Sequence, residues 1–206
     1  MTPLPAPLVL AVDLGGVVFL PVADGDAMTV LGDLLGVPPE VVRTTLWRSG
    51  DIESANVGRI SAEEYAAGAA DRMSVSSASV LAAIESVYAG RLNEPLVAYL
   101  RALAPTTTVV AVTNDWSFLD RLLARHGIAD LFDVVINSAD VGCRKPSVEF
   151  FRILLERLDC GAERVVFVDD DEANVAAARS LGLRTVHFRT PDSLGEIDVE
   201  MRRATA

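Results

Sequence analysis

Several side chains capable of acid–base, anion-binding or metal chemistry stand at or near the ends of short apolar runs of this sequence. They are Asp13, Thr113, Asn114, Lys145, Asp169 and Asp170. In open α/β sheets a ligand binds at the carboxyl ends of the strands, where polar groups from different strands meet. We therefore interpret these residues together, as one candidate site at such an edge.

Taken singly, each of these residues also has a purely structural explanation. A carboxylate such as Asp13 or Asp169 after an apolar run commonly caps a turn or a helix. The hydroxyl of Thr113 could satisfy the following turn, and Lys145 before Pro146 could be an ordinary exposed residue. The combination and its order, rather than any one residue, favour a functional site.

Lys145 is unusual because it is the only lysine among the 18 lysine and arginine residues of the chain. An ammonium group is a compact point charge, whereas guanidinium is a planar fork. One retained lysine is consistent with a site that requires the compact charge, although chance could also produce it.

The elements that must position these side chains follow from the apolar pattern. Five short runs are apolar at successive positions, which is typical of strands buried on both faces: residues 8–13, 108–113, 133–137, 164–169 and 184–188. Helical patterns lie between and around them, at residues 94–103, 118–126, 146–158 and 173–181. Alternating strands and helices predict a doubly wound parallel α/β sheet.

The region between the first strand and the second breaks this alternation. Its patterns are helical only, at residues 27–35, 39–49, 62–73 and 79–88, and Ser61 with Glu64 fits a capping box. We therefore predict an α/β core formed by residues 1–22 and 91–206, and an inserted helical cap formed by residues 23–90.

Composition argues against several functional classes. The chain has 206 residues, a formal net charge of -11 and a pI near 4.6. A field of this sign repels nucleic acids and anionic membranes, so we expect neither as a partner. The first apolar run is too short to span a bilayer and lacks a basic leader, which favours a cytoplasmic protein. Cys143 and Cys160 belong to no metal-binding or disulfide pattern.

Four motifs in order resemble the haloacid dehalogenase superfamily over nearly the whole chain. They are VDLGGVV at residues 12–18, VAVTN at 110–114, Ser138 followed by VGCRKP at 141–146, and VFVDD at 166–170 followed by Asn174. The helical insert is similar to the small cap of one branch of that superfamily. Four motifs in the same order make a chance match improbable.

The resemblance implies a phosphohydrolase acting on a small phosphorylated metabolite. Asp13 would attack phosphorus and form an aspartyl-phosphate, which water then hydrolyses. Thr113 and Lys145 would contact the phosphoryl group and offset its charge. Backbone amides would complete the phosphate cradle, as turn amides do for other anions: those of Leu14, Gly15 and Asn114.

The resemblance also implies a magnesium ion as cofactor. Asp13, the backbone carbonyl of Gly15 and the carboxylate of Asp170 would bind it. Asp169 would be a further ligand or would lie just outside the ligand set, and Asn174 would orient the loop.

Gly15 departs from the family pattern, because many family phosphatases carry there a second aspartate that acts as general acid and base. Such a group contributes about 10² to 10⁴ in rate. We therefore expect slow turnover, and faster dephosphorylation in Gly15→Asp if the backbone accepts a side chain. Replacement acids could be Asp115, Asp51 or Glu53, although acidic residues in such loops are more often exposed to solvent.

Two other functions remain open on the sequence. A dehalogenase of the same fold attacks carbon and needs no metal, so it has no reason to keep both Asp169 and Asp170. A weakly active or non-catalytic module that binds a phosphorylated ligand would explain Gly15. Specificity would come from cap side chains, and resemblance favours a sugar phosphate, such as a hexose 1-phosphate, as the substrate.

Overall fold

The protein is built around one parallel five-stranded sheet. The computed structural model describes residues 8–20, 27–47, 49–88, 90–104, 106–190 and 193–205. The strands stand in the order β5-β4-β1-β6-β7, and all neighbours are parallel. Their bounds are β1 Val9–Val12, β4 Thr108–Thr113, β5 Val134–Asn137, β6 Val165–Asp169 and β7 Arg184–His187.

The central strands β1 and β6 are apolar up to the Asp169 that ends β6, because helices cover both faces of the sheet. All residues of β1 and β6 are buried. Side chains alternate between the faces of a strand. Accordingly, Val9 and Ala11 pack into one hydrophobic cluster, whereas Leu10 and Val12 pack into another. The predicted doubly wound α/β fold is confirmed.

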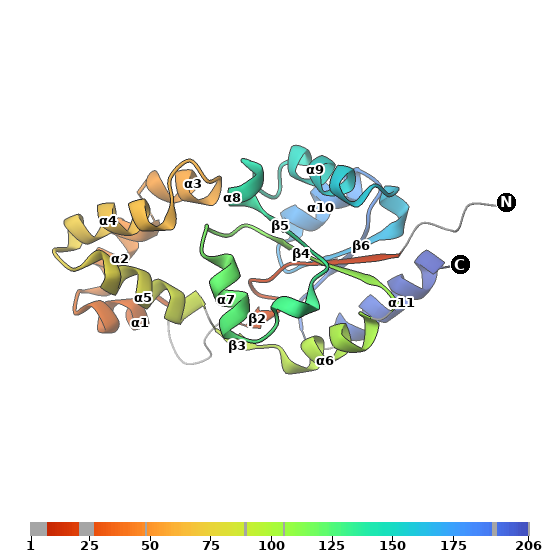
Figure 1. Cartoon of the computed structure of the whole chain (residues 1–206), viewed down its shortest axis with the longest axis horizontal. Coiled ribbons are helices and arrows are strands. Elements are labelled where there is room, and N and C mark those ends of the chain that lie inside the picture. The colour runs from red at the N-terminus through yellow and green to blue at the C-terminus, as the bar shows by residue number, and fades with distance from the viewer. Residues whose placement is uncertain are drawn as a thin grey trace.

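The covering helices lie in two layers (Figure 1). Helices α9 (Val148–Leu158) and α10 (Glu172–Ser180) cover the face that Val9 and Ala11 share. On the other face lie α6 (Glu94–Leu103), α7 (Leu119–Arg125) and α11 (Ser193–Thr205). The short helix α8 (Ser138–Val141) follows β5 directly.

A group of helices forms a separate lobe at one end of the molecule (Figure 1). It contains α1 (Ala27–Leu35), α2 (Pro39–Val42), a π-helical turn (Arg43–Trp47), α3 (Asp51–Asn56), α4 (Ala62–Met73) and α5 (Ser77–Tyr88). An antiparallel pair, β2 (Phe19–Leu20) and β3 (Arg91–Leu92), stands where the chain leaves and rejoins the core. The expected boundary at residues 22 and 23 lies outside the described residues.

Trp116, which follows β4, is one of the residues through which the lobe packs onto the core. Its indole Nε1 donates a hydrogen bond of 2.6 Å to Asn56 Oδ1 in α3, and its ring lies 4.6 Å from that of Tyr65 in α4. On the surface, Arg144 beside the core site pairs with Glu53 of α3 at 3.3 Å. These contacts hold the lobe over the carboxyl edge of the sheet.

Some elements differ from the prediction. Residues 39–49 do not form one helix, because α2 passes into the π-helical turn. Gly50 stands in a turn, and Asp51 begins α3, which was not predicted. Helix α11 was not predicted, although Ile197, Met201 and Ala204 have helical spacing and are buried. The capping box of Ser61 and Glu64 is confirmed, with both of its hydrogen bonds present.

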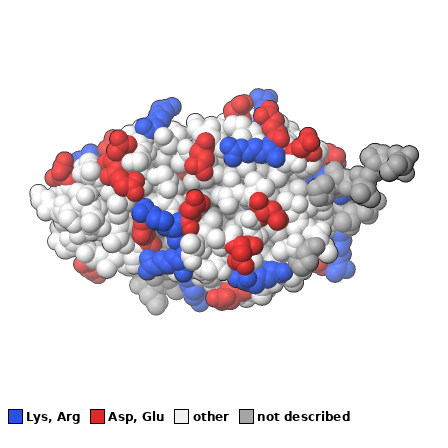
Figure 2. Space-filling model, viewed as in Figure 1, with Lys and Arg blue, Asp and Glu red and all other residues white. Residues whose placement is uncertain are grey.

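The surface carries mixed charge. On the face drawn in Figure 2, acidic and basic side chains are interspersed, and the basic ones do not gather into one patch. Within the described ranges, no helix combines the length and apolar character that a membrane span requires. Cys143 and Cys160 are both free thiols.

Candidate active site at the carboxyl edge of the sheet

The predicted site residues converge because three adjacent strands end at the same edge. Asp13 follows the central strand β1, Thr113 ends β4 on one side, and Asp169 ends β6 on the other. A cavity of about 350 Å³ opens there, and Asp13, Thr113 and Asn114 are among its lining residues. Polar groups far apart in the sequence thus meet at one point.

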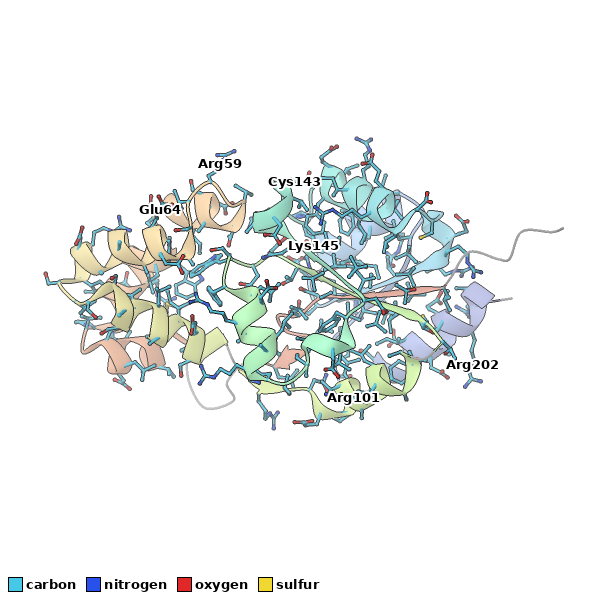
Figure 3. The ribbon with its side chains drawn as sticks, in the orientation of Figure 1. Arg59, Glu64, Arg101, Cys143, Lys145 and Arg202 are labelled. Carbon is cyan, nitrogen blue, oxygen red and sulfur yellow. The ribbon has the colours of Figure 1, made fainter. Side chains whose placement is uncertain are left out.

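Lys145 is the centre of a buried ion cluster. Its side chain is 1% exposed, and its Nζ lies 2.9 Å from Asp13 Oδ1 and 2.7 Å from Asp169 Oδ2. Nζ also donates a hydrogen bond of 2.8 Å to the carbonyl oxygen of Val112. Three acceptors match the three hydrogens of an ammonium group. Figure 3 shows Lys145 inside the molecule, near the lobe, whereas Arg59 points outward.

The cluster contains more negative than positive charge. The pKa of Asp13 is raised from 3.8 to about 7, chiefly by burial; the charge of Lys145 opposes this rise, and the charge of Asp169 adds to it. Burial by itself lowers the pKa of Lys145, but the charges of Asp13 and Asp169 outweigh burial, so the pKa is raised. Lys145 is therefore charged at neutral pH, and one cation serves two carboxylates.

Asn114 fixes the backbone of Lys145. Its Nδ2 donates to the Lys145 carbonyl and its Oδ1 accepts from the Lys145 amide, both at 2.9 Å. The side chain of Asn114 is therefore occupied in positioning Lys145. The amide of Leu14 donates to Asp13 Oδ1 at 2.7 Å, which orients that carboxylate. That the backbone amides of Leu14, Gly15 and Asn114 hold phosphate, as the sequence suggested, stays a prediction.

Asp13, Asp169 and Asp170 could hold a metal ion. Each offers a carboxylate oxygen, and the three oxygens lie within 4.8 Å of one another. Oxygen-only ligands suit Mg²⁺. Asp169 is anchored more firmly than Asp170, because its oxygens also accept from the Asp171 amide at 2.8 Å and from Asn174 Nδ2 at 3.0 and 3.1 Å.

Asp115 is the one candidate replacement acid that lines the cavity. It is 5% exposed, and its Oδ1 accepts from the Trp116 amide at 2.7 Å. Burial raises its pKa to about 7, although that hydrogen bond acts in the opposite direction. Asp115 therefore reaches the cavity, as its candidacy requires, although acidic residues in such loops are more often exposed. Asp51 pairs with Arg72, and Glu53 with Arg144, and neither lines the cavity.

Gly15 has room for a side chain. Its φ is not positive, and a Cβ built on it would meet no atom within 4 Å. Gly16 differs, because its φ is +73° and a Cβ there would lie 2.1 Å from Asp170 Oδ2. The backbone condition on Gly15→Asp is therefore met, whereas Gly16 admits no side chain beside Asp170.

The sequence interpretation missed two residues that support Asp170. His187 Nε2 lies 2.9 Å from the Asp170 carbonyl oxygen, and Arg189 Nε donates to His187 Nδ1 at 3.2 Å. Since Nδ1 accepts, Nε2 carries the proton and donates to Asp170. No local sequence signal shows this, because the contact joins the ends of two neighbouring strands.

A family model described as haloacid dehalogenase-like hydrolase matches residues 52–182. The matched range includes Thr113, Lys145 and the Asp169 loop.

Two curated relatives are phosphatases. A ribulose-1,5-bisphosphate 5-phosphatase from Halopiger xanaduensis is 36% identical over 99 residues, which are 47% of this chain and 41% of that protein. A sesquiterpene phosphatase from Aspergillus oryzae is 40% identical over 68 residues, 33% of this chain and 35% of that protein. The chain thus spans less than half the length of either relative.

A solved structure with a similar fold is a HAD family enzyme from Bacteroides thetaiotaomicron in complex with magnesium and inorganic phosphate. The TM-score is 0.76 at 20% identity, and the match covers 87% of this chain and 93% of that one. At this identity the likeness shows a shared fold.

Proposed function

The chain belongs to the haloacid dehalogenase-like hydrolases, and we propose that it is a magnesium-dependent phosphohydrolase of small phosphomonoesters. The observation that carries the proposal is the arrangement of Asp13. Its carboxylate lines the cavity, lies 2.9 Å from the Lys145 ammonium and belongs to a set of three carboxylates suited to a cation. A nucleophile that must approach a phosphate dianion needs such compensating charge.

The reaction would proceed in two displacements at phosphorus. An oxygen of Asp13 forms a bond to phosphorus while the ester P–O bond breaks and the alcohol leaves. Water then attacks the phosphorus of the aspartyl-phosphate and releases inorganic phosphate and the free carboxylate. Lys145 holds Asp13 in place in both steps, and the Thr113 hydroxyl donates to a phosphoryl oxygen.

Mg²⁺ would be held by Asp13, the carbonyl of Gly15 and Asp170, with Asp169 anchoring Lys145 beside it. When bound, the ion supplies positive charge that neutralises the phosphoryl oxygens. Asn174 supports this assignment, because its Oδ1 is buried and has no hydrogen-bond partner among the described residues. That oxygen is free to accept from a water in the ligand shell.

Asp115 would act as the general acid and base in place of the aspartate that Gly15 replaces. Its protonated carboxyl gives a proton to the leaving alcohol oxygen, and the resulting carboxylate takes one from the attacking water. Its place in the cavity wall supports this role, and burial keeps a substantial fraction protonated near neutral pH.

We expect Asp115→Asn to lower kcat for alkyl phosphates by about 10² to 10⁴. The loss should be smaller for p-nitrophenyl phosphate, whose leaving group departs without a proton. In wild type, kcat/KM should fall as pH rises above about 7, because the first step needs the protonated carboxyl of Asp115. This fall should be absent in Asp115→Asn. Asp51→Asn, on the surface, is the control. If kcat falls equally for alkyl phosphates and for p-nitrophenyl phosphate, Asp115 does not transfer the proton to the leaving group.

In the Asp115→Asn background, Gly15→Asp is expected to raise kcat at least tenfold. In the wild-type background, the same substitution should change kcat by a smaller factor. Open space at Gly15 allows the new carboxyl to take over proton transfer. The measurement is a double-mutant cycle on kcat with rapid-quench detection of the phosphorylated enzyme. An equal gain in both backgrounds would show that Asp115 performs no acid–base work.

The overall proposal is tested by phosphate release from a panel of phosphomonoesters, with magnesium and with excess chelator. Hydrolysis that requires the metal is the expected result. Hydrolysis that persists in chelator would contradict the metal requirement. Release of halide from 2-haloacids without metal would instead identify a dehalogenase. Ligand binding without any turnover would identify the phospho-ligand-binding module that Gly15 also allows.

A further inference from the structure

The lining of the active-site cavity is divided by chemistry and by origin. Its polar side chains come from the loops after β1 and β4, which also hold the catalytic groups. The described lining side chains outside these two loops are largely apolar and come from β2, α5, α7, the start of α1 and the end of the π-helical turn: Phe19, Leu20, Ala27, Trp47, Val87 and Leu122. Among the described lining residues, the charged and amide side chains thus lie at the reacting end.

This division constrains the alcohol part of a substrate. The hydroxyls of a sugar lose their water when bound, and each needs a new partner, since an unpaired buried hydroxyl is costly. Outside the two catalytic loops, the indole N–H of Trp47 is the single polar side-chain group among the described lining residues. A hydrocarbon group needs no such partners and gains by leaving water.

The size of the cavity limits the hydrocarbon. At about 350 Å³ it lies near the lower end of the ~300 to 1,000 Å³ found for small-molecule sites. Part of that volume must hold the phosphoryl group beside Asp13. The remainder suits a short chain or a single ring rather than a long lipid.

We propose that the cavity selects monophosphate esters of apolar alcohols, with a short alkyl or prenyl group against Trp47, Val87 and Leu122. The inference rests on the phosphohydrolase function proposed above and names its substrate class. The sugar phosphate suggested by resemblance stays a prediction, which the same experiments test.

The first experiment measures kcat/KM for n-alkyl phosphates from ethyl to octyl, with glucose 1-phosphate and glucose 6-phosphate alongside. Each added methylene should raise kcat/KM by about twofold to fourfold, the gain expected for burying a CH₂ group, until the cavity is filled. The hexose phosphates should rank below butyl phosphate. A flat series, or a preference for a hexose phosphate, would overturn the substrate class while leaving the phosphohydrolase function intact.

The second experiment measures binding without turnover, using n-alkylphosphonates of the same lengths in isothermal titration calorimetry with magnesium. Affinity should rise with chain length, and the heat capacity of binding should become more negative. If binding follows chain length but no phosphomonoester is hydrolysed, the proposed function is wrong and the apolar specificity stands. If affinity does not depend on length, the apolar specificity is wrong.

A matched pair of variants locates the effect. Val87→Asn places a polar group in the cavity lining and should reduce the ratio of octyl to ethyl kcat/KM at least tenfold. Leu34→Asn makes the same kind of change on α1, at a side chain that is 54% exposed and does not line the cavity, and should leave the ratio unchanged. Equal ratios in Val87→Asn and wild type would show that the hydrocarbon lies elsewhere.

Discussion

Asp13→Asn is expected to lower kcat by roughly 10⁴-fold or more, the scale seen when a catalytic nucleophile is removed. An amide has nearly the same shape as the carboxylate but carries no charge and attacks phosphorus poorly. Steady-state phosphate release and the absence of a phosphorylated enzyme in rapid-quench samples measure the loss. Asp33→Asn, at an exposed position of α1, is the control and should behave as wild type.

The same variant should not lose stability. Asp13 is buried, and its folded pKa is raised from 3.8 to about 7, so the folded state disfavours the charged carboxylate. Wild type without metal should therefore lose stability relative to Asp13→Asn as pH rises from about 4 to 7. Urea unfolding in chelator across that range measures the difference. Near-normal turnover in the variant, or a marked loss of its stability, would contradict the role given to Asp13.

Lys145→Arg is expected to lower kcat/KM by about 10² to 10³ although the charge is retained, a loss comparable to removing one preorganised donor. Three acceptors converge on Nζ at 2.7 to 2.9 Å, from Asp13, Asp169 and the Val112 carbonyl. A planar guanidinium cannot direct its N–H groups to all three. It is also larger, and the Phe167 ring already lies 5.6 Å from Nζ.

The free energy of unfolding of Lys145→Arg should fall by about 1 to 3 kcal/mol, as is typical when a buried site is overpacked. Arg144→Lys is the matched control at the preceding residue, where the side chain is exposed and pairs with Glu53 on the surface. Its effect on kcat/KM should be less than about twofold, because exposed ion pairs contribute little. Wild-type kinetics in Lys145→Arg would show that the ammonium supplies charge alone and that its shape is immaterial.

Much of the core could be predicted from the sequence because its signals are local. Strand β4 and helices α1, α4 and α6 have the predicted bounds, since an apolar run or a helical repeat appears wherever an element has buried faces. The C-terminal helix α11 was missed even though its spacing was visible. Helix α3 was missed because it is short and follows Gly50, which indicated a turn.

By itself, the sequence determined the family and the identity of the candidate site residues, because the four motifs contain Asp13, Thr113, Lys145 and Asp169 in a fixed order. The tertiary structure alone decided how these groups interact. Lys145 has three acceptors and Asp115 is buried in the cavity wall because segments remote in sequence pack around them. Burial and charge compensation depend on all neighbours in space, and the apolar wall arises only where the helical lobe meets the core.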